Sequence, residues 1–495
     1  MVGLARRSTM RASLTGRFRL PAPLMTAFIV FFLVVGTYYV VVKGTRRSAI
    51  NRWKPMVAEL LAGEDIYRKF AFPTPPIMAL VLVPFTSLAG AWTMGAWYLL
   101  RALLAIAALI LLLRMVQPIY PRWSLSAQLG LFLLISRPIM GDLLHGNVNL
   151  WILFLVVAGF AAFRQGWDWT AGGAISLAAA CKLTPVLLVP YFAVKRQFRL
   201  VAIACVGLVA WTFLVPGMAL GMVRNAELVR HWAEAMVVPY VVRGEVTTEQ
   251  INQSVPALIH RFTTAKPAIF PDDGRPPITL NLVALSGTTV TLVTKGVSLT
   301  IFLALLWACR TRWPERRHVG YLHEFGLVLI ATLWLSERTW KHHYVLLVPS
   351  FVFLVATVAR LLAEGDRRRG VFLASGLGFA GMAMASTSND LAKPLFGEDG
   401  PKVMQAYGAY LWASLAVAAC HLNCIVRLRD RKINPPEGSS FERITTCPVD
   451  TDLPADRLVG RFPGCGLSNR SCQTRANTRQ ASVETGWNSR KSERS

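Results

Sequence analysis

The chain has 495 residues, of which 54% are hydrophobic and only 16% charged, yet its formal net charge is +26. A soluble chain of this length would divide into several domains and carry charge on about a quarter of its residues. The composition therefore excludes an ordinary soluble enzyme, a disulfide-rich scaffold and a mainly disordered chain. It indicates a polytopic membrane protein whose excess positive charge has a particular location.

The apolar segments begin directly after a basic N-terminus. Residues 1–22 hold five arginines and no acid, and the apolar stretch that follows is too long for a signal peptide. We therefore predict an uncleaved first span. Because a spanning helix needs about 20 apolar residues, the sequence predicts an all-α protein with about twelve transmembrane helices. These lie near 23–42, 76–91, 93–114, 126–137, 147–163, 169–194, 199–217, 281–309, 320–336, 343–362, 371–388 and 404–426.

Charge in the connectors predicts the orientation. With the N-terminus inside, four basic stretches also fall inside, as the positive-inside rule requires: 195–199, 310–317, 367–369 and 427–429. The segment 126–137 is short for a span, so a re-entrant segment stays open there. Counting spans in this way places residues 146–149 toward the inside. We divide the chain into a basic N-terminus (1–22), a membrane domain (23–426) and a disordered basic tail (427–495) that tethers to anionic lipid.

The first outside loop breaks the charge rule. Residues 43–70 carry seven basic and three acidic side chains, a net charge of +4 on the outer face. Phosphate on a lipid headgroup is the expected partner of such a loop. Five apolar residues recur at helical spacing within it and predict a short helix in the membrane interface: Trp53, Met56, Val57, Leu60 and Leu61. Pro55 suits the first turn of that helix and Gly63 the position after its end.

The three acids of this loop have two interpretations. Glu59, Glu64 and Asp65 lie where the helix ends, so one of them can take a proton from an acceptor hydroxyl. Alternatively, all three balance neighbouring bases on a wet surface. The loop alone does not choose between these interpretations.

Polar residues within or beside the spans form four further clusters. They stand out because placing a polar side chain near the bilayer interior costs free energy. Lys182 lies in mid-span with no adjacent acid, and Pro185 predicts local unwinding that opens room for a ligand. The stretch 336–344 places a His pair beside Lys and Trp, which suits a phosphate clamp with an aromatic wall for a sugar. The other two clusters are 142–149 and 252–254. Neither the histidines nor the eight cysteines have metal-ligand spacing, so we predict no protein metal site.

Five of these stretches resemble glycosyltransferase family 87, whose members use polyprenyl-phosphate sugars and belong to the C-type superfamily of polytopic enzymes. The matching stretches, in chain order, are Gly63, Ile66 and Tyr67 with Pro73-Thr74-Pro75-Pro76, then Gly146-Asn147-Val148-Asn149, Lys182-Leu183-Thr184-Pro185, Asn252-Gln253-Ser254, and Trp340 with His342-His343-Tyr344. The resemblance implies a catalytic Asp in the first outside loop that acts as base in an inverting transfer. Asn51 falls near that position and cannot act as a base.

Given the resemblance, either another first-loop acid is the base or this chain differs in activity. Among the acids we favour Asp65 over Glu64 and Glu59. Lys182, His342, His343 and Arg68 are the expected donor phosphate-binding residues. The expected substrate-binding residues are Asn147, Asn149, Asn252, Gln253 and Trp340.

The resulting hypothesis is an inverting hexosyltransferase, a multi-pass protein of the cell membrane whose active site faces the extracytoplasmic side. The expected sugar is mannose, with another hexose or a pentose left open. Its partners would be a polyprenyl-phosphate sugar, a glycolipid or glycan acceptor and membrane lipids, with no nucleic acid. Phosphates can bring Mg²⁺ without a protein cage, so a donor-borne Mg²⁺ stays open and no other cofactor is expected. The alternatives are a transporter or flippase of an anionic polyprenyl-linked lipid, and a catalytically inert envelope scaffold.

Overall fold

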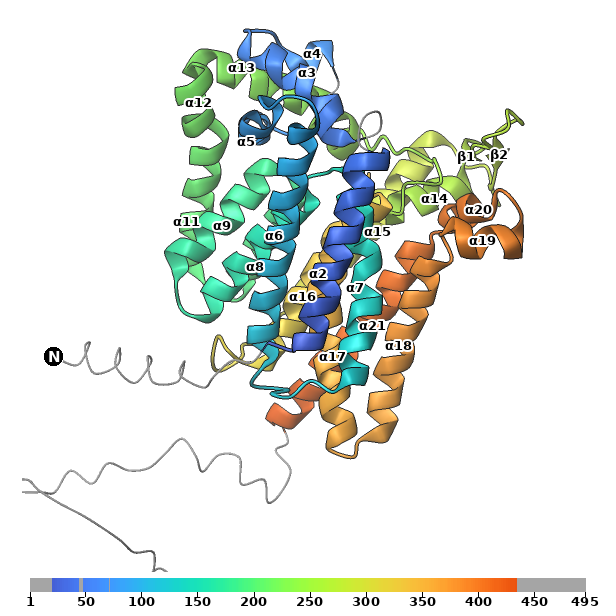
Figure 1. Cartoon of the computed structure of the whole chain (residues 1–495). Helices are drawn as coiled ribbons and strands as arrows, with labels where there is room; N and C mark the ends of the chain where they lie inside the picture. Colours follow the sequence, from blue (N-terminus) through green and yellow to red (C-terminus); the bar gives the residue numbers. More distant parts are fainter. Residues whose placement is uncertain (1–19, 44–47, 71, 434–495) are drawn as a thin grey trace, which may run out of the picture. The chain divides into compact units, whose positions relative to one another are not determined.

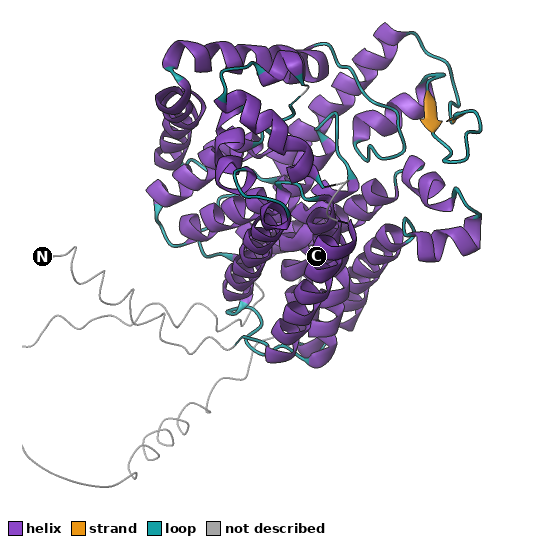
Figure 2. Ribbon diagram, turned by 45° about the horizontal axis from the view of Figure 1, so that its top comes forward, coloured by secondary structure: helices purple, strands orange, loops and turns teal. Residues whose placement is uncertain are grey.

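The computed structural model describes residues 20–43, 48–70 and 72–433. Most of the predicted basic N-terminus and the tail from residue 434 lie outside the described residues. The described chain is predominantly helical, with one small two-stranded sheet (Figures 1 and 2). Its first elements are α2 (Ala22–Tyr38), the π-helix η1 (Tyr39–Lys43), α3 (Ala49–Leu61), α4 (Ile66–Lys69), α5 (Pro76–Thr86), α6 (Ala91–Val116), α7 (Leu125–His145), α8 (Asn149–Arg164), α9 (Asp168–Cys181), the 3₁₀-helix η2 (Thr184–Leu187) and α10 (Leu188–Val194).

The second half contains two further π-helices, η3 and η4, and a long lateral segment between α13 and α15. Strands β1 and β2 pair antiparallel, with Pro267 opposite Thr279. The elements are α11 (Phe198–Val209), η3 (Ala210–Leu214), α12 (Val215–Leu220), α13 (Met222–Trp232), η4 (Ala233–Val242), α14 (Val255–Thr263), β1 (Pro267–Ile269), β2 (Ile278–Thr279), α15 (Gly287–Ala308), α16 (Val319–Trp334), the 3₁₀-helix η5 (Lys341–Leu347), α17 (Val348–Ala363), α18 (Arg367–Ala385), α19 (Asn389–Phe396), α20 (Gly400–Ala406) and α21 (Ala409–Ile433).

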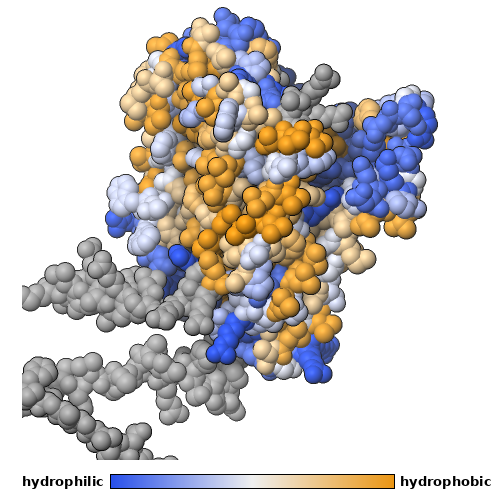
Figure 3. Space-filling view, viewed as in Figure 1, coloured by the Kyte–Doolittle hydropathy of each residue, from blue (hydrophilic) through white to orange (hydrophobic). Residues whose placement is uncertain are grey.

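Seven helices of the described chain are long and apolar enough to cross a membrane, or eight if the bent pair α18 and α19 is one span. Their outer faces expose large apolar side chains, such as Leu33 on α2 and Leu133 on α7. Figure 3 shows such side chains gathered in the middle of one face, with hydrophilic ones over the β1–β2 and α19–α20 region. The prediction of an all-α polytopic membrane protein is confirmed, whereas the count of twelve spans stays a prediction.

The predicted span at 76–91 is too long. Helix α5 has 11 residues, about 16 Å at 1.5 Å per residue, against a hydrocarbon core of about 30 Å. Both of its ends contact the first loop, since Tyr67 donates to the Thr74 carbonyl at 2.9 Å and Lys54 donates to the Leu88 carbonyl. Helix α5 therefore enters and returns at one end of the helices.

The predicted span at 169–194 also returns to where it started. Helix α9 stops at Cys181, and the chain turns back through η2 and α10. The first residue of α9 and the residue that follows α10 both contact the connector 309–318. Arg316 pairs with Asp168 at 2.5 Å, and Lys195 donates to the Thr311 carbonyl. The break follows the local sequence, because Pro185 lacks an amide hydrogen and disfavours helix before it.

The segment 126–137 proves to be a full helix. Helix α7 has 21 residues and ends at His145, so residues 146–149 lie at the end of the helices that carries the first loop. This corrects the prediction that they face inside, which followed from counting α5 as a span. Lys195 and Arg429 contact the connector 308–311, and the α17–α18 turn lies at that same lower end in Figure 1. The basic connectors therefore gather opposite the first loop.

The first-loop helix is confirmed as α3, although it starts six residues before Pro55, which lies inside it. Trp53, Val57 and Leu60 are buried against the molecule, while Leu61 is exposed rather than part of the apolar face. Gly63 follows the helix with a φ of 107°, in the left-handed region that favours glycine.

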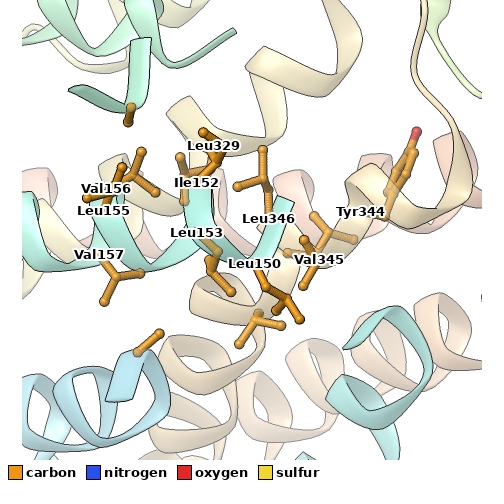
Figure 4. Packing of buried hydrophobic residues seen from close by; sticks show 14 of the residues in the cluster. Leu150, Ile152, Leu153, Leu155, Val156, Val157, Leu329, Tyr344, Val345 and Leu346 are labelled. Atoms are coloured by element: carbon orange, nitrogen blue, oxygen red, sulfur yellow. The ribbon is translucent and has the colours of Figure 1, made fainter. Parts of the chain in front are cut away.

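The central core joins α8 to α16 and η5. Figure 4 shows Leu150, Ile152 and Leu153 of α8 close to Leu329 of α16 and Leu346 of η5. All of these are nearly or fully buried. Because η5 begins at Lys341, this core fixes the segment that carries the His pair.

Candidate active site

A cavity of about 720 Å³ opens between α3, the α7–α8 turn, the α9–η2 break, η4 and the segment before η5. This volume lies within the usual range of small-molecule sites. We call it the main cavity. Its polar and aromatic walls come from residues distant in sequence: Arg52, Trp53, Thr74, His145, Asn147, Lys182, Thr184, Trp232, Tyr240, Thr332, Ser336, Glu337, Arg338, Trp340, His342 and His343. Five predicted site residues therefore meet here: Asn147, Lys182, Trp340, His342 and His343.

Lys182 lies at the α9–η2 break, and a chain of buried polar groups fixes its position. Its Nζ donates to Asn149 Oδ1 at 2.5 Å, and Asn149 Nδ2 donates to Asp142 Oδ1 at 2.8 Å. Asp142 also pairs with Arg101 at 3.7 Å, and both of these side chains are fully buried. Asn149 does not line the cavity. Its predicted substrate contact is therefore replaced by a positioning contact to Lys182.

The Gly146-Asn147 turn brings α7 close to η5. Gly146 ends α7 with a φ of 74°, and an added Cβ would lie 2.5 Å from Ser48 Oγ. Only glycine fits such a close approach in the left-handed region. Asn147 follows it and contacts His342, with 3.0 Å between Asn147 Nδ2 and His342 Nε2. This contact joins two of the predicted stretches across 195 residues of sequence.

Three imidazoles and an indole form one wall of the main cavity. The rings of His145 and His342 stack with centroids 4.2 Å apart, and Trp340 meets His342 edge-on at 5.4 Å. His343 Nδ1 accepts a hydrogen bond from the Trp340 amide at 3.3 Å. Aromatic faces beside hydrogen-bonding nitrogens suit a sugar ring and a phosphate.

Asn252 and Gln253 are fully buried and do not line the main cavity. Asn252 Nδ2 donates to the Glu337 carbonyl at 2.7 Å, and its Oδ1 accepts from the Thr339 amide at 3.0 Å. The Gln253 amide group is likewise engaged by backbone groups, including the Gln405 carbonyl at 2.6 Å. The Asn252 amide thus holds the segment 336–340 in place, and the Gln253 amide ties its own loop to the start of α21. Their substrate contacts stay predictions that this geometry does not favour.

The first-loop acids also lie outside the cavity wall. Asp65 caps α4 through the Tyr67 amide at 2.9 Å and pairs with His231 Nδ1 at 2.5 Å. Glu59 pairs with Lys69 at 2.8 Å, and Glu64 is exposed. None of these acids lines the main cavity, and neither does Arg68, although their predicted roles require contact with the substrates. Their catalytic and phosphate-binding roles stay predictions that the geometry does not favour.

Arg68 is bound elsewhere, with its Nη2 2.9 Å from His231 Nε2. Its side chain is 69% exposed, so it belongs to the outer surface of the loop. The physical reason is that Asp65, His231 and Arg68 join the first loop to α13 and satisfy one another.

Four charged or imidazole side chains of the main cavity were missed as site residues: Arg52, His145, Glu337 and Arg338. Arg338 donates to the Tyr240 hydroxyl at 2.9 Å and lies beside the Trp340 ring. The signal for Glu337 and Arg338 was their place within the stretch 336–344, three and two residues before Trp340. Arg52 directly follows Asn51, the residue near the expected base.

Glu337 is the acidic residue among the described residues that line this cavity. Burial raises the pKa of Glu337, with the positive charge of Lys295 opposing that rise. The described part of the chain holds no group of three His, Cys, Asp or Glu side chains arranged for a metal ion. These residues therefore do not fit a protein-held metal, although a Mg²⁺ ion brought by a phosphate needs no such group.

Comparisons with known proteins agree with the resemblance. The family model of glycosyltransferase family 87 matches residues 72–333. A polyprenol-phosphate-mannose-dependent alpha-(1-2)-phosphatidylinositol mannoside mannosyltransferase from Mycolicibacterium smegmatis is 25% identical over 365 residues, covering 70% of this chain and 74% of that protein. A pentamannoside mannosyltransferase from the same organism is 27% identical, covering 57% of this chain and 61% of its own length.

Among solved structures, ArnT from Cupriavidus metallidurans bound to undecaprenyl phosphate is 15% identical. The match covers 83% of this chain and 79% of that chain, with a TM-score of 0.40.

Proposed function

The chain belongs to glycosyltransferase family 87, and we propose that it transfers a mannosyl residue from a polyprenyl-phosphate donor to a glycolipid or envelope glycan. The observation that carries the proposal is the main cavity, where Lys182, His342 and Trp340 meet. A lysine and imidazoles suit the donor phosphate, and an indole suits the sugar. The names of the two mycolicibacterial relatives support mannose, a polyprenol phosphate and phosphatidylinositol mannosides as the substrate classes.

The charge of the cavity wall suits departure of a phosphate. When the bond between the sugar and the donor phosphate breaks, negative charge grows on the leaving oxygen. Lys182, Arg52 and Arg338 all line the cavity, and fixed positive groups stabilise such charge strongly in a site with little water. The expected reaction is a single displacement that inverts the anomeric carbon.

The lipid chain of the donor has an apolar path beside these groups. The π-helix η4 contributes Ala235, Met236, Val237 and Val241 to the cavity wall, with Trp232 directly before it. These residues are not fully buried within the protein. An isoprenoid chain covering them would remove apolar surface from water, which favours binding.

The proposed site faces the extracytoplasmic side. The support is that the basic connectors gather at the end opposite the first loop, and basic connectors stay on the cytoplasmic side. In chains lacking other reactive cysteines, Glu64→Cys should react with an impermeant maleimide in intact spheroplasts. Glu364→Cys should react only after lysis, and the reverse pattern would contradict this orientation.

Purified protein supplied with radiolabelled polyprenyl-phosphate mannose and phosphatidylinositol mannosides tests the proposed reaction. Labelled product glycolipid is expected, and Lys182→Ala should abolish it. The matched control is Lys393→Ala, which changes an exposed lysine paired with Glu398. Label that changes leaflets without chemical transfer would instead support a flippase.

Any Mg²⁺ is proposed to arrive with the donor phosphate. Transfer in the presence of excess EDTA measures this requirement. A fall in rate that added Mg²⁺ restores would support a donor-borne ion, and an unchanged rate would contradict it.

A further inference from the structure

A second cavity, of about 350 Å³, adjoins the main cavity and is used by nothing described so far. We call it the side cavity. Val241, Leu335 and Glu337 line both cavities, so these three residues form the boundary between them. The remaining wall consists of residues from the η4 end and α15: Gly244, Val246, Thr291, Thr294, Lys295 and Ser298.

One face of α15 is polar in an otherwise apolar helix. Thr291, Thr294, Lys295 and Ser298 recur at helical spacing of three and four residues, which places them on one face. Elsewhere on α15 the exposed side chains include leucines, such as Leu299, which is 56% exposed. A polar stripe on a spanning helix is costly against lipid and therefore indicates contact with a polar ligand or protein group.

The hydroxyl of Thr294 supplies an independent sign of a ligand. Thr294 is 7% exposed, and its Oγ1 has no hydrogen-bond partner. A buried hydroxyl without a partner is destabilising, so a ligand that bonds to it is favoured. Lys295 also reaches this wall, where its Nζ donates to the Val242 carbonyl at 2.9 Å. A sugar or polyol headgroup would supply the hydroxyls that such a wall lacks.

Glu337 lies at the boundary, where its carboxylate interacts with its own backbone amide and with the charge of Lys295. The backbone of Glu337 is fixed, because its carbonyl accepts from Asn252 at 2.7 Å. By contrast, no described side chain donates a hydrogen bond to its carboxylate, and Lys295 is its charged neighbour. It is also the carboxylate that the described residues contribute to the two cavity walls. The first-loop acids, as shown above, are engaged or exposed elsewhere.

We propose that Glu337 is the general base of the transfer and that the side cavity holds the hydroxylated headgroup of the acceptor lipid. This inference rests on the proposed function and names its base and its acceptor site. The acceptor O–H bond breaks, and its proton passes to the Glu337 carboxylate. The acceptor oxygen then bonds to the anomeric carbon, while the bond from that carbon to the donor phosphate breaks. Its electron pair leaves with the polyprenyl phosphate beside Lys182.

Glu337→Gln tests the base because it keeps the shape of the side chain and removes its basicity. With labelled polyprenyl-phosphate mannose and phosphatidylinositol mannosides, transfer should fall by about 10²–10⁴-fold, the usual contribution of a general base. Binding of the labelled donor should change less than about 2-fold, since Glu337 is not a phosphate ligand. Glu337→Asp should recover part of the rate. The matched control, Glu364→Gln, changes an exposed glutamate that pairs with Arg360 and should transfer normally.

The pH profile supplies a second readout. Burial raises the pKa of Glu337. As the pH falls, its carboxylate therefore becomes protonated, and stops acting as a base, at a pH above about 4.3, the pKa of an ordinary glutamate. The acidic limb of wild-type transfer should lie above that value and should be absent from the residual rate of Glu337→Gln. A purely structural role would leave the limb unchanged.

Thr294→Val tests the side cavity by removing the hydroxyl at nearly constant volume. The KM for phosphatidylinositol mannosides should rise about 3–10-fold, the effect of one hydrogen bond, with the donor KM unchanged. Thr300→Val is the matched control, because Thr300 is exposed on the same helix and bonds its own backbone.

Three kinds of outcome would overturn the inference. Full transfer by Glu337→Gln would show that Glu337 is not the base, and loss of transfer in Asp65→Asn alone would place the base in the first loop. Loss of donor binding in Glu337→Gln would make the residue a donor ligand. Wild-type protein that neither binds nor uses the donor would overturn the proposed function and this inference with it, whereas the first two results leave that function intact.

Discussion

Lys182 and Lys195 are both lysines within the apolar part of the chain, and they differ in what meets their charge. Lys195 Nζ lies 2.6 Å from Glu324 Oε2, and the same carboxylate accepts from Trp313 at 2.9 Å. Lys182 Nζ instead contacts the neutral amide of Asn149 at 2.5 Å and lines the main cavity. The ion pair makes Lys195 part of the scaffold, whereas Lys182 keeps a charge available for a phosphate.

This difference shows that a buried lysine alone does not indicate a binding site. A carboxylate within direct contact neutralises the charge and leaves nothing for a ligand. Asp142 would be the equivalent partner of Lys182, but it is already bound by Asn149 and paired with Arg101. The interposed amide therefore separates a functional lysine from a structural one.

The largest expected effect is on stability at Lys195. Lys195→Met should lower the free energy of unfolding by about 3–5 kcal/mol, because Glu324 would remain buried without a charge partner. Unfolding in detergent measures this loss. The double variant with Glu324→Leu should recover most of it, and a double variant as unstable as the single one would contradict the ion-pair explanation.

Lys182→Met should affect the reaction rather than the fold. Removing one group that stabilises developing charge typically costs about 10²–10³-fold in rate. Because Asn149 keeps its bond to Asp142 at 2.8 Å, unfolding should change by less than about 1 kcal/mol. Comparing transfer per folded molecule with the unfolding midpoint checks both parts. A fall in stability equal to that of Lys195→Met would remove the contrast between the two lysines.

Asn149→Leu tests the amide that lies between Lys182 and Asp142. It removes the acceptor that holds Lys182 Nζ, and misplacing a group by about 1 Å can cost about 10²-fold in rate. Transfer should therefore fall about 10–100-fold. In the double variant with Lys182→Met the losses should not multiply, since both act through one group. Multiplying losses would mean that Asn149 acts independently, as the sequence prediction had it.

Asp65→Asn should have the smallest effect. Asparagine still caps a helix well, and the partly exposed pair with His231 is worth up to about 1 kcal/mol. Transfer should stay within about 3-fold of the wild type. A loss of 100-fold or more would restore Asp65 as the base and identify the first loop, rather than the segment 336–340, as the catalytic region.

Much of the candidate site could be predicted from local sequence. Pro185 predicted the break at Lys182, and the composition of 336–344 predicted the His and Trp wall. The sequence could not tell whether the amides of Asn252 and Gln253 bind substrate, as predicted, or backbone groups, because a polar stretch in a long loop looks the same in both cases. Only their complete burial against the segment 336–340 separates these uses.

The count of twelve spans stays a prediction, but two of the segments that it counted turn back instead of crossing, for a physical reason. Hydropathy measures whether a segment is apolar, and the short helix α5 and the α9–α10 hairpin are apolar because protein and lipid surround them. It does not report whether the chain crosses or returns. Counting α5 as a crossing moved residues 146–149 to the wrong end, away from His342, which Asn147 contacts.

The +26 charge and the apolar runs determined by themselves that this is a membrane protein with its basic connectors on one side, because those properties depend on composition along the chain. The family stretches could likewise be recognised in order. Which lysine keeps its charge for a ligand, and which acid lines the two cavities, was decided only by tertiary structure. Charge neutralisation acts over a few ångströms in space, and the partners concerned lie 33 and 129 residues apart in sequence.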